Sequence, residues 1–464
     1  MIRTANRKTT LGVIIGSRAF FSPAPCRDAR DQVTAQLDRL GVDIVTLPFE
    51  ATANGAVQSI DDAKLYADHF KAHRDEIDGL VICLPNFGDE IAVIELINRT
   101  KLDVPILLQA SNDEIDKVDV HSRRDAFCGK ISVSNNLWQY GVPFTETTQH
   151  TCDVDSESFG ADLERFSRLC RTVRGLKNAR VGAIGARTGP FQTMRYSEKL
   201  LQASGMTVVT ADLSELIAAA EAIPDDDTEL HEKLGRIRGY GTIPAHIRDG
   251  QVLKQGKWTL AVNRWIDENE CDASAIQCWR SLQDNFGCAT CLTMSMMASG
   301  APAAILDWNN NYGNEVDKCV CTHCGNYPKS FLGETPEVGE LDVLGEVIGR
   351  EKCFGAVKGK VQPGPMTYFR LSSDDRNGML KAYVGEGDFT DDPFGMDGGI
   401  AVTSIRDLRT LMRFVTRHGF EHHVAMVRGH HADIVNEAAT RYLGWPIYHH
   451  NGTPEPQLSM PNRF

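Results

Sequence analysis

Residues 307–313 carry the side chains with the clearest chemical potential: Asp307, Trp308, Asn309, Asn310, Asn311, Tyr312 and Gly313. The apolar run 303–306 before them predicts a buried strand that ends at Asp307 and presents its carboxylate at the C-terminal edge. The asparagines, tyrosine and glycine then predict a turn rich in hydrogen-bond donors and acceptors but without charge. This combination favours a neutral, polyhydroxylated ligand held beside a metal-binding carboxylate.

Histidines near the C-terminal end form the second set of reactive groups. His422 and His423 lie between Phe420 and the apolar residues 424–427, where an imidazole must find a partner. Imidazole is the commonest metal ligand in proteins, so this pair predicts a contact with a metal or ligand. Two further histidine pairs, at 430–431 and 449–450, are explained more simply by a helix start and a solvated terminus.

The cysteines offer an alternative metal site. Cys288 and Cys291 form one C-x2-C pair and Cys321 and Cys324 form another, as in structural zinc sites. The two pairs are further apart than usual, and much of the sequence between them is apolar and strand-like. Because buried free cysteine commonly acts as a small hydrophobic residue, we favour buried thiols over zinc.

Composition limits the possible partners. The 464 residues are 42% hydrophobic and 24% charged, and the net charge is −13. This acidic balance argues against nucleic acid and anionic membranes as partners. The longest uncharged stretch, 285–306, contains Gly300 and Pro302, which disfavours a membrane helix. Thirteen scattered cysteines predict reduced thiols, and so we expect a cytoplasmic protein.

The order of elements predicts an α/β fold with a different C-terminal part. Residues 1–170 alternate strands (11–16, 43–48, 79–85, 104–109) with helices (28–40, 61–73, 89–99). Residues 171–349, which carry Asp307, repeat this pattern with strands at 180–185, 207–213 and 275–279. We therefore expect two Rossmann-like or flavodoxin-like domains with parallel sheets. Residues 350–464, which carry the His-His pair, predict an antiparallel β-rich domain with strands at 367–371, 380–384 and 399–404.

The chain resembles the L-fucose isomerase-like sugar isomerases, and more distantly L-arabinose isomerase. The resemblance covers nearly the whole sequence and is carried by residues 134–141, 184–187, 195–198, 275–279, 307–313, 323–324 and 419–425. It implies two α/β domains and a C-terminal β-rich domain. It also implies homotrimers or homohexamers with active sites at subunit contacts.

The resemblance further implies a metal-dependent site that binds a monosaccharide. Asp307 corresponds to an acidic ligand, His323 to a mid-chain histidine ligand, and His423 or its neighbour His422 to the C-terminal ligand. Carboxylate oxygen and imidazole nitrogen together suit Mn²⁺, or Mg²⁺ or Co²⁺, better than metals that prefer thiolate. The substrate contacts implied are Asn309, Asn310, Asn311, Tyr312, Trp279, Gln277, Arg18 and Trp138.

The implied reaction is a ketol isomerisation, which moves a sugar carbonyl between C1 and C2 through a cis-enediol. It requires removal of a proton from carbon, and Asp307 is expected to be one acid/base partner as well as a ligand.

One departure from the family pattern bears on activity. Similar sequences carry an Ala-Cys-Glu-x-Asp motif and a helix before the Asp-Trp-Asn-Asn-Asn-Tyr-Gly stretch, whereas here Met297 runs directly into Ala298. The family's first glutamate, a metal ligand and acid/base group, is therefore missing. Either a longer form of the chain contains the segment, which the close match of both flanks favours, or the protein is a non-catalytic, sugar-binding relative.

Overall fold

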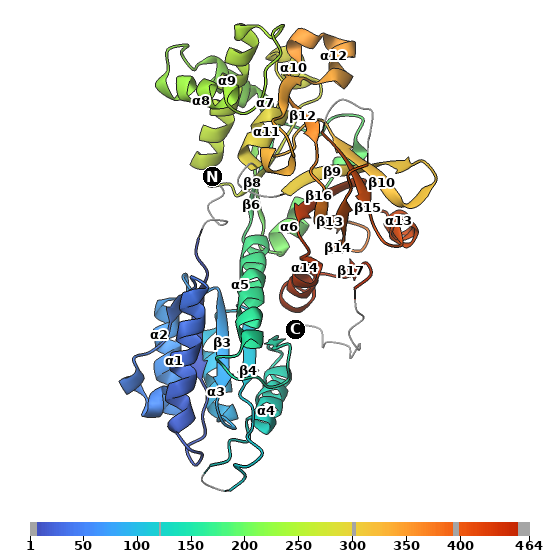
Figure 1. Cartoon of the computed structure of the whole chain (residues 1–464). Helices are drawn as coiled ribbons and strands as arrows, with labels where there is room; N and C mark the ends of the chain where they lie inside the picture. The colour runs from blue at the N-terminus through green and yellow to red at the C-terminus, as the bar shows by residue number, and fades with distance from the viewer. Residues whose placement is uncertain (1–6, 120–121, 299–302, 393–398, 453–464) are drawn as a thin grey trace. The chain divides into compact units, whose positions relative to one another are not determined.

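The computed structural model describes residues 7–119, 122–298, 303–392 and 399–452 (Figure 1). The chain divides into two compact units. Of the described residues, those within 177–436 and 445–452 form unit 1, and those within 7–176 and 437–444 form unit 2. A short C-terminal segment thus belongs with the N-terminal part of the chain.

Unit 2 is built on a five-stranded parallel sheet in the order β2-β1-β3-β4-β5. Its strands are β1 (Thr10–Ile15), β2 (Asp43–Val45), β3 (Gly79–Leu84), β4 (Ile106–Ala110) and β5 (Thr145–Glu146). All residues of β3 and β4 are buried, which is expected of strands covered on both faces.

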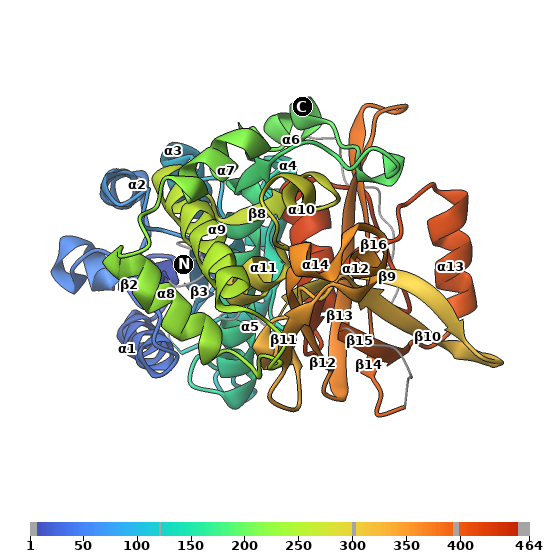
Figure 2. The ribbon, with the colours of Figure 1, turned by 90° about the horizontal axis from the view of Figure 1, so that it is seen from above.

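Five helices cover the sheet of unit 2: α1 (Ala24–Arg39), α2 (Ile60–Ala72), α3 (Glu90–Thr100), α4 (Ala126–Gln139) and α5 (Glu157–Lys177). Figure 2 shows α2, α3 and α4 on one side of the sheet and α1 and α5 on the other. Helices α2 and α3 begin after residues that commonly cap a helix. Ser59 and Asp89 each accept a hydrogen bond from the backbone N–H three residues further along the chain.

Unit 1 begins with a three-stranded parallel sheet in the order β7-β6-β8. The strands are β6 (Arg180–Ile184), β7 (Thr207–Ala211) and β8 (Ala273–Ile276). The helices of this part are α6 (Glu198–Ala203), α7 (Leu213–Glu221), α8 (Thr228–Arg238), α9 (Asp249–Glu268), α10 (Ser281–Asn285) and α11 (Cys291–Met297). A short 3₁₀ turn, Gln192–Met194, lies in the loop between β6 and α6.

A nine-stranded sheet forms the rest of unit 1, in the order β11-β12-β15-β10-β9-β16-β13-β14-β17. The strands are β9 (Ala303–Tyr312), β10 (Glu315–His323), β11 (Glu337–Glu340), β12 (Phe354–Lys360), β13 (Gly364–Asp374), β14 (Met379–Phe389), β15 (Gly399–Ser404), β16 (His423–Arg428) and β17 (Ile447–His449). Most neighbours are antiparallel; β12–β15 and β14–β17 are parallel. The accompanying helices are α12 (Asp342–Ile348), α13 (Leu408–Arg417) and α14 (Ala432–Glu437). The π-helical turn Ala438–Leu443, which follows α14, belongs to unit 2.

The predicted fold class is confirmed: parallel-sheet α/β parts precede an antiparallel, β-rich part. Within the described residues, none of the helices combines the length and apolar character needed to cross a bilayer.

The expectation that a strand ends at Asp307 is wrong, because β9 continues to Tyr312. Asp307 lies in the middle of this strand, and the asparagines form its second half instead of a turn. The turn is at Gly313, which has a φ of 57° and connects β9 to β10. Pairing with β10 keeps this polar half extended, and the register shift there leaves Asn309 as an extra, bulged residue.

Packing around α4 gives a stability prediction for unit 2. A Cβ added to Gly129 in α4 would lie 2.0 Å from the carbonyl oxygen of Phe87, whereas nothing lies within 4 Å of one added to Gly175 in α5. We expect Gly129→Ala to lower the free energy of unfolding by about 1–3 kcal/mol. Gly175→Ala should raise it by about 0.5–1 kcal/mol. Urea unfolding followed by circular dichroism measures both, and equal effects would contradict the packing.

Candidate metal centre

Asp307 is the residue of β9 at which the pairing changes from one neighbouring strand to the other. Strand β10 pairs with the second half of β9 and β16 pairs with the first half, both antiparallel. The two neighbours overlap only at Asp307, which is paired with Thr322 of β10 on one side and His423 of β16 on the other. Because β10 ends at His323 and β16 begins at His423, both histidines are placed beside this carboxylate.

Three side chains meet at this level: Asp307, His323 and His423 each offer one ligand atom, and these atoms lie within 4.8 Å of one another. The rings of His323 and His423 are 5.6 Å apart between centroids, and His423 Nε2 is 3.3 Å from Asp307 Oδ1. The side chains of Asp307 and His423 are only 22% and 12% exposed. The sequence therefore identified three groups, far apart in the chain, that the fold brings together.

Burial sets the protonation of this cluster. It raises the pKa of Asp307 to about 7, because the charged carboxylate loses its water. Burial also lowers the pKa of His323 to about 4 and that of His423 to about 3, with smaller contributions from neighbouring positive charge at His422. Both imidazoles are thus neutral at physiological pH, so their contact with Asp307 is no ion pair. A negative oxygen beside two neutral imidazoles is a donor set for a divalent cation.

Two buried atoms of the cluster have no hydrogen-bond partner: Oδ1 of Asp307 and Nδ1 of His423. Buried polar atoms are rarely left unpaired, and a bound cation would satisfy both. His323 fits less well, because its Nδ1 accepts a hydrogen bond from the backbone N–H of Cys324 at 2.8 Å. A neutral ring that accepts at Nδ1 carries its proton on Nε2, so His323 would give up this bond to become a ligand.

Glu421 anchors the start of β16. Arg370 donates from Nε and Nη2 to Oε2 of Glu421, at 3.1 and 2.9 Å, and the hydroxyl of Ser372 donates to Oε1 at 2.8 Å. Both carboxylate oxygens are therefore used by β13, which holds His423 in place beside Asp307. The sequence analysis gave no role to Arg370 or Ser372, because the contact depends on the pairing of β13 with β16.

The remaining predicted site residues are placed as follows. The ring of His422 lies 4.3 Å from that of His423 between centroids and is tilted by 32°, but His422 lies outside the three-residue cluster. The side chains of Asn309, Asn310 and Asn311 are exposed, and Tyr312 is half-buried. Gln277 and Trp279 follow β8, where the amide oxygen of Gln277 accepts from the N–H of Ala186 at 2.8 Å.

Arg18 and Trp138 belong to unit 2. Arg18 follows β1, donates from Nε to the carbonyl of Gly88 at 3.0 Å and lies over the ring of Phe87 at 4.1 Å. Trp138 is 39% exposed on α4.

A zinc site formed by the cysteines is not supported. Among the described residues, the one group of side chains arranged to hold a metal ion is Asp307, His323 and His423. Cys288, Cys291 and Cys321 are buried. His450, expected in a solvated terminus, is also buried, and its ring contacts the carbonyl of Arg406 at 2.9 Å.

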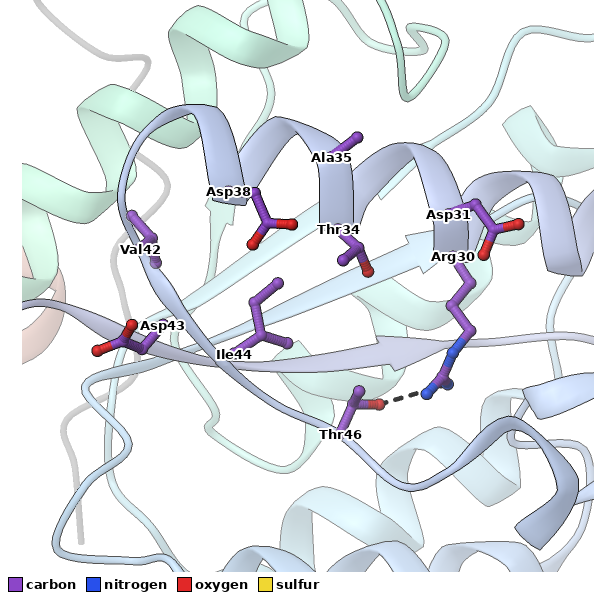
Figure 3. A pocket seen from close by; sticks show the side chains of 9 residues that line it. All are labelled: Arg30, Asp31, Thr34, Ala35, Asp38, Val42, Asp43, Ile44 and Thr46. Atoms are coloured by element: carbon purple, nitrogen blue, oxygen red, sulfur yellow. Dashed lines mark hydrogen bonds between the residues drawn. The ribbon is translucent and has the colours of Figure 1, made fainter.

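A hollow of about 750 Å³ lies elsewhere, between α1 and β2 of unit 2 (Figure 3). It is lined by Arg30, Asp31, Thr34, Ala35, Asp38, Val42, Asp43, Ile44 and Thr46. None of these is a predicted site residue, and Arg30 is already bonded to Thr46.

Comparison with known proteins identifies the family of this chain. The model "Fucose/sulfoquinovose isomerase, N-terminal domain" matches residues 12–177, and "L-fucose isomerase, C-terminal domain" matches residues 321–450. The chain belongs to the fucose isomerase-like family. Accordingly, it is a ketol isomerase that interconverts aldose and ketose sugars. The C-terminal match includes His323 and His423 but begins after Asp307, whose assignment therefore rests on geometry.

Individual relatives are distant. The sulfoquinovose isomerases of Priestia aryabhattai and Priestia megaterium are each 22% identical over 405 residues, which is 80% of this chain and 85% of theirs. That of Alkalicoccus urumqiensis is 24% identical over 309 residues, 59% of this chain and 65% of its own. Among solved structures, a sugar ABC transporter from Yersinia enterocolitica covers 65% of this chain and 73% of its own at 12% identity; its TM-score of 0.16 carries no argument.

The orphaned atoms of the cluster lead to a metal-binding prediction. We expect Mn²⁺, added to chelator-treated protein at a hundred times its Kd, to raise the free energy of unfolding by about 2.7 kcal/mol. Asp307→Asn and His423→Gln should each abolish this gain, because they remove a charged oxygen and an imidazole nitrogen. Thermal unfolding with and without Mn²⁺ measures it. His231→Gln, on the exposed face of α8, is the matched control and should keep the full gain.

Proposed function

We propose that this protein is a metal-dependent isomerase that uses Mn²⁺, or Mg²⁺ or Co²⁺, bound by Asp307, His423 and His323. The observation that carries the proposal is a half-buried carboxylate, with a buried and unpaired Oδ1, beside two neutral imidazoles. A divalent cation there would act as a Lewis acid toward negative charge that develops on the sugar oxygens.

Asp307 is proposed to carry the proton as well. Burial raises its pKa to about 7 in the absence of a cation, and a carboxylate beside the reacting carbons can accept a proton and return it. The proton leaves C2 of the aldose as O1 is protonated, which gives a cis-enediol. The same proton then returns to C1 as the O2 hydroxyl loses its proton, and the ketose results. A cis-enediol is planar, so C1 and C2 can both be reached from the same side. A single carboxyl group on that side can therefore take the proton from C2 and return it to C1.

The exposed amides of Asn309, Asn310 and Asn311, with Tyr312, are proposed to bind sugar hydroxyls. They lie on the same strand as Asp307, two to five residues further along the chain. Gln277, Trp279, Arg18 and Trp138 are proposed as further substrate contacts. The substrate proposed is a modified hexose, either a 6-deoxy sugar such as fucose or a 6-sulfonated sugar such as sulfoquinovose, on which the relatives are named to act.

Removing the carboxylate tests the catalytic role. Asp307→Asn should lower kcat for aldose–ketose conversion by about 10²–10⁴-fold, because the amide cannot accept the C2 proton. Conversion is followed by chromatography, and exchange of the C2 proton by NMR in D₂O. Asp317→Asn, an exposed carboxylate on β10, serves as the control and should retain full activity. Substantial turnover by Asp307→Asn would reject the role.

A second candidate, a non-catalytic sugar-binding relative, is favoured by one observation, the missing glutamate segment. Helix α11 ends at Met297, where the segment would begin, and residues 299–302 before β9 lie outside the described residues. The same D₂O measurement separates the candidates. A bound aldose whose C2 proton never exchanges, in protein that retains its metal, would establish binding without catalysis.

Assembly and location complete the proposal. We propose a homotrimer or homohexamer with active sites at subunit contacts. Support comes from α4, where Phe127, Ile131 and Trp138 follow a helical spacing and are 50%, 49% and 39% exposed. Light scattering at several protein concentrations tests this oligomeric state.

A cytoplasmic location is proposed because all thirteen cysteines are free.

A further inference from the structure

We propose that Cys278 is a modification site: a nucleophilic thiol that a hydroperoxide oxidises and that Cys291 then captures in a disulfide. Both residues belong to unit 1, where Cys278 follows β8 and Cys291 is the first residue of α11. No sugar and no bound metal take part, and the reaction is therefore independent of the proposed function.

Hydrogen-bond donors converge on the sulfur of Cys278. The side-chain amide of Gln283 donates from Nε2 to Cys278 Sγ at 2.7 Å. The backbone N–H of Thr290 and the thiol of Cys291 donate to the same sulfur. Gln283 is fully buried, so the atoms packed around its amide hold that donor against the sulfur. A neutral thiol is a weak acceptor, whereas three donors are an arrangement that stabilises the negative charge of a thiolate.

These bonds lower the pKa of Cys278. The hydrogen bond from Cys291 has the largest effect, and those from Thr290 and Gln283 add to it, against the opposing effect of burial. Burial instead raises the pKa of Cys170 in α5, because the loss of water is the largest effect at that thiol. The thiolate is the form of cysteine that attacks an oxidant, so the donors activate Cys278 relative to a thiol of the apolar core.

Cys278 also differs from its neighbouring thiols in access to solvent. It is partly exposed, whereas Cys288, Cys291 and Cys353 are buried. Cys353 and Cys278 belong to one apolar cluster, so the outer thiol of that cluster is the one with the stabilised thiolate. Low pKa, solvent access and a second thiol alongside are the features of cysteines that hydroperoxides oxidise reversibly.

Cys291 is placed to form the disulfide. Its hydrogen bond to Cys278 and its burial raise its pKa, so that it keeps its proton while Cys278 is the thiolate. The two cysteines lie on separate segments, which lets their Cα atoms approach. In contrast, the sulfurs of Cys319 and Cys321 are 3.9 Å apart, but these residues alternate on β10. A rise of about 3.4 Å per residue separates their Cα atoms by about 6.8 Å, the upper limit for a disulfide.

The reaction balances with hydrogen peroxide as the oxidant. The Cys278 thiolate attacks one peroxide oxygen, an S–O bond forms, the O–O bond breaks, and the departing hydroxide takes up a proton to become water. Cys278 is then a sulfenic acid. The sulfur of Cys291 attacks it, an S–S bond forms, the S–O bond breaks, and the oxygen leaves as a second water with the Cys291 proton. Two thiols lose two electrons in total, and the peroxide gains them.

Peptide mass mapping of the full chain tests the proposal. The Cys128→Ser background removes an exposed thiol, and a chelator prevents metal-catalysed oxidation. Equimolar hydrogen peroxide should consume two thiols per chain and join the peptides of Cys278 and Cys291, and dithiothreitol should reverse this change. The rate of Cys278 alkylation by iodoacetamide should reach half its maximum below about pH 8.5, the ordinary pKa of cysteine. Gln283→Leu, which removes one donor, should raise that midpoint by about 0.5–1 pH unit.

Three further variants identify the role of each thiol. Cys291→Ser should stop the reaction at the sulfenic acid of Cys278, which dimedone traps. Cys278→Ser should abolish both the disulfide and the dimedone adduct. Cys353→Ser removes a buried thiol of the same apolar cluster, and as the matched control it should keep the disulfide between Cys278 and Cys291.

Three results would overturn the inference: an alkylation midpoint of Cys278 at or above about pH 8.5, a disulfide between other cysteines, or thiol consumption that Cys278→Ser leaves unchanged. Circular dichroism checks the fold of each variant. The alkylation midpoint and the disulfide map are measured with Cys278 and Cys291 both present, so they decide the question even where a variant fails to fold. A protein without isomerase activity would give the same results, which keeps this test separate from the proposed function.

Discussion

The offset pairing of two strands along β9 is the constraint on which the metal centre depends. Strands β10 and β16 cover opposite halves of β9 and meet at Asp307, so a strand end and a strand start bring two histidines to one carboxylate. A one-residue slip of either strand would move its histidine away from the carboxylate and turn its side chains to the other face. The register is fixed independently on both sides, by the β10–β15 ladder and by Glu421 bonded to Arg370 and Ser372 on β13.

Burial makes this cluster costly without a ligand. Removing water from Asp307 raises its pKa to about 7, and the loss of water from His323 and His423 keeps both rings neutral. No positive side chain among the described residues compensates the carboxylate, which leaves its Oδ1 unpaired. A structural ion pair would be built differently, with a lysine or arginine opposite the acid, as Arg370 is opposite Glu421. The cluster therefore has the character of a binding site whose stability depends on its ligand.

The sequence predicted the local elements well and the long-range pairing poorly. Alternating apolar runs and helical stretches identified β1 to β4 and α1 to α3 of unit 2, because the hydrophobic period of each segment specifies it, whereas α4 and β5 were not predicted. The end of the strand at Asp307 was wrong, since asparagines that would form a turn in isolation are held extended by β10 and absorbed by the bulge at Asn309. The Arg370–Glu421 anchor was missed for the same reason: only the β13–β16 pairing brings those residues together. His423 was singled out because an imidazole among apolar residues needs a partner, and His323 because the family resemblance implied it; the fold places both beside Asp307.

The missing glutamate need not remove the chemistry, because the two tasks of the site can be separated. Stabilising charge on the sugar oxygens requires a cation, and for that Asp307, His423 and His323 already supply three donors. Moving the proton requires one carboxyl group on the face shared by C1 and C2, and Asp307 is the carboxyl group of this cluster. A second carboxylate would strengthen metal binding and share the proton transfer. The absence of that second carboxylate therefore predicts weaker metal binding and slower turnover. The site still has groups for both tasks, metal binding and proton transfer.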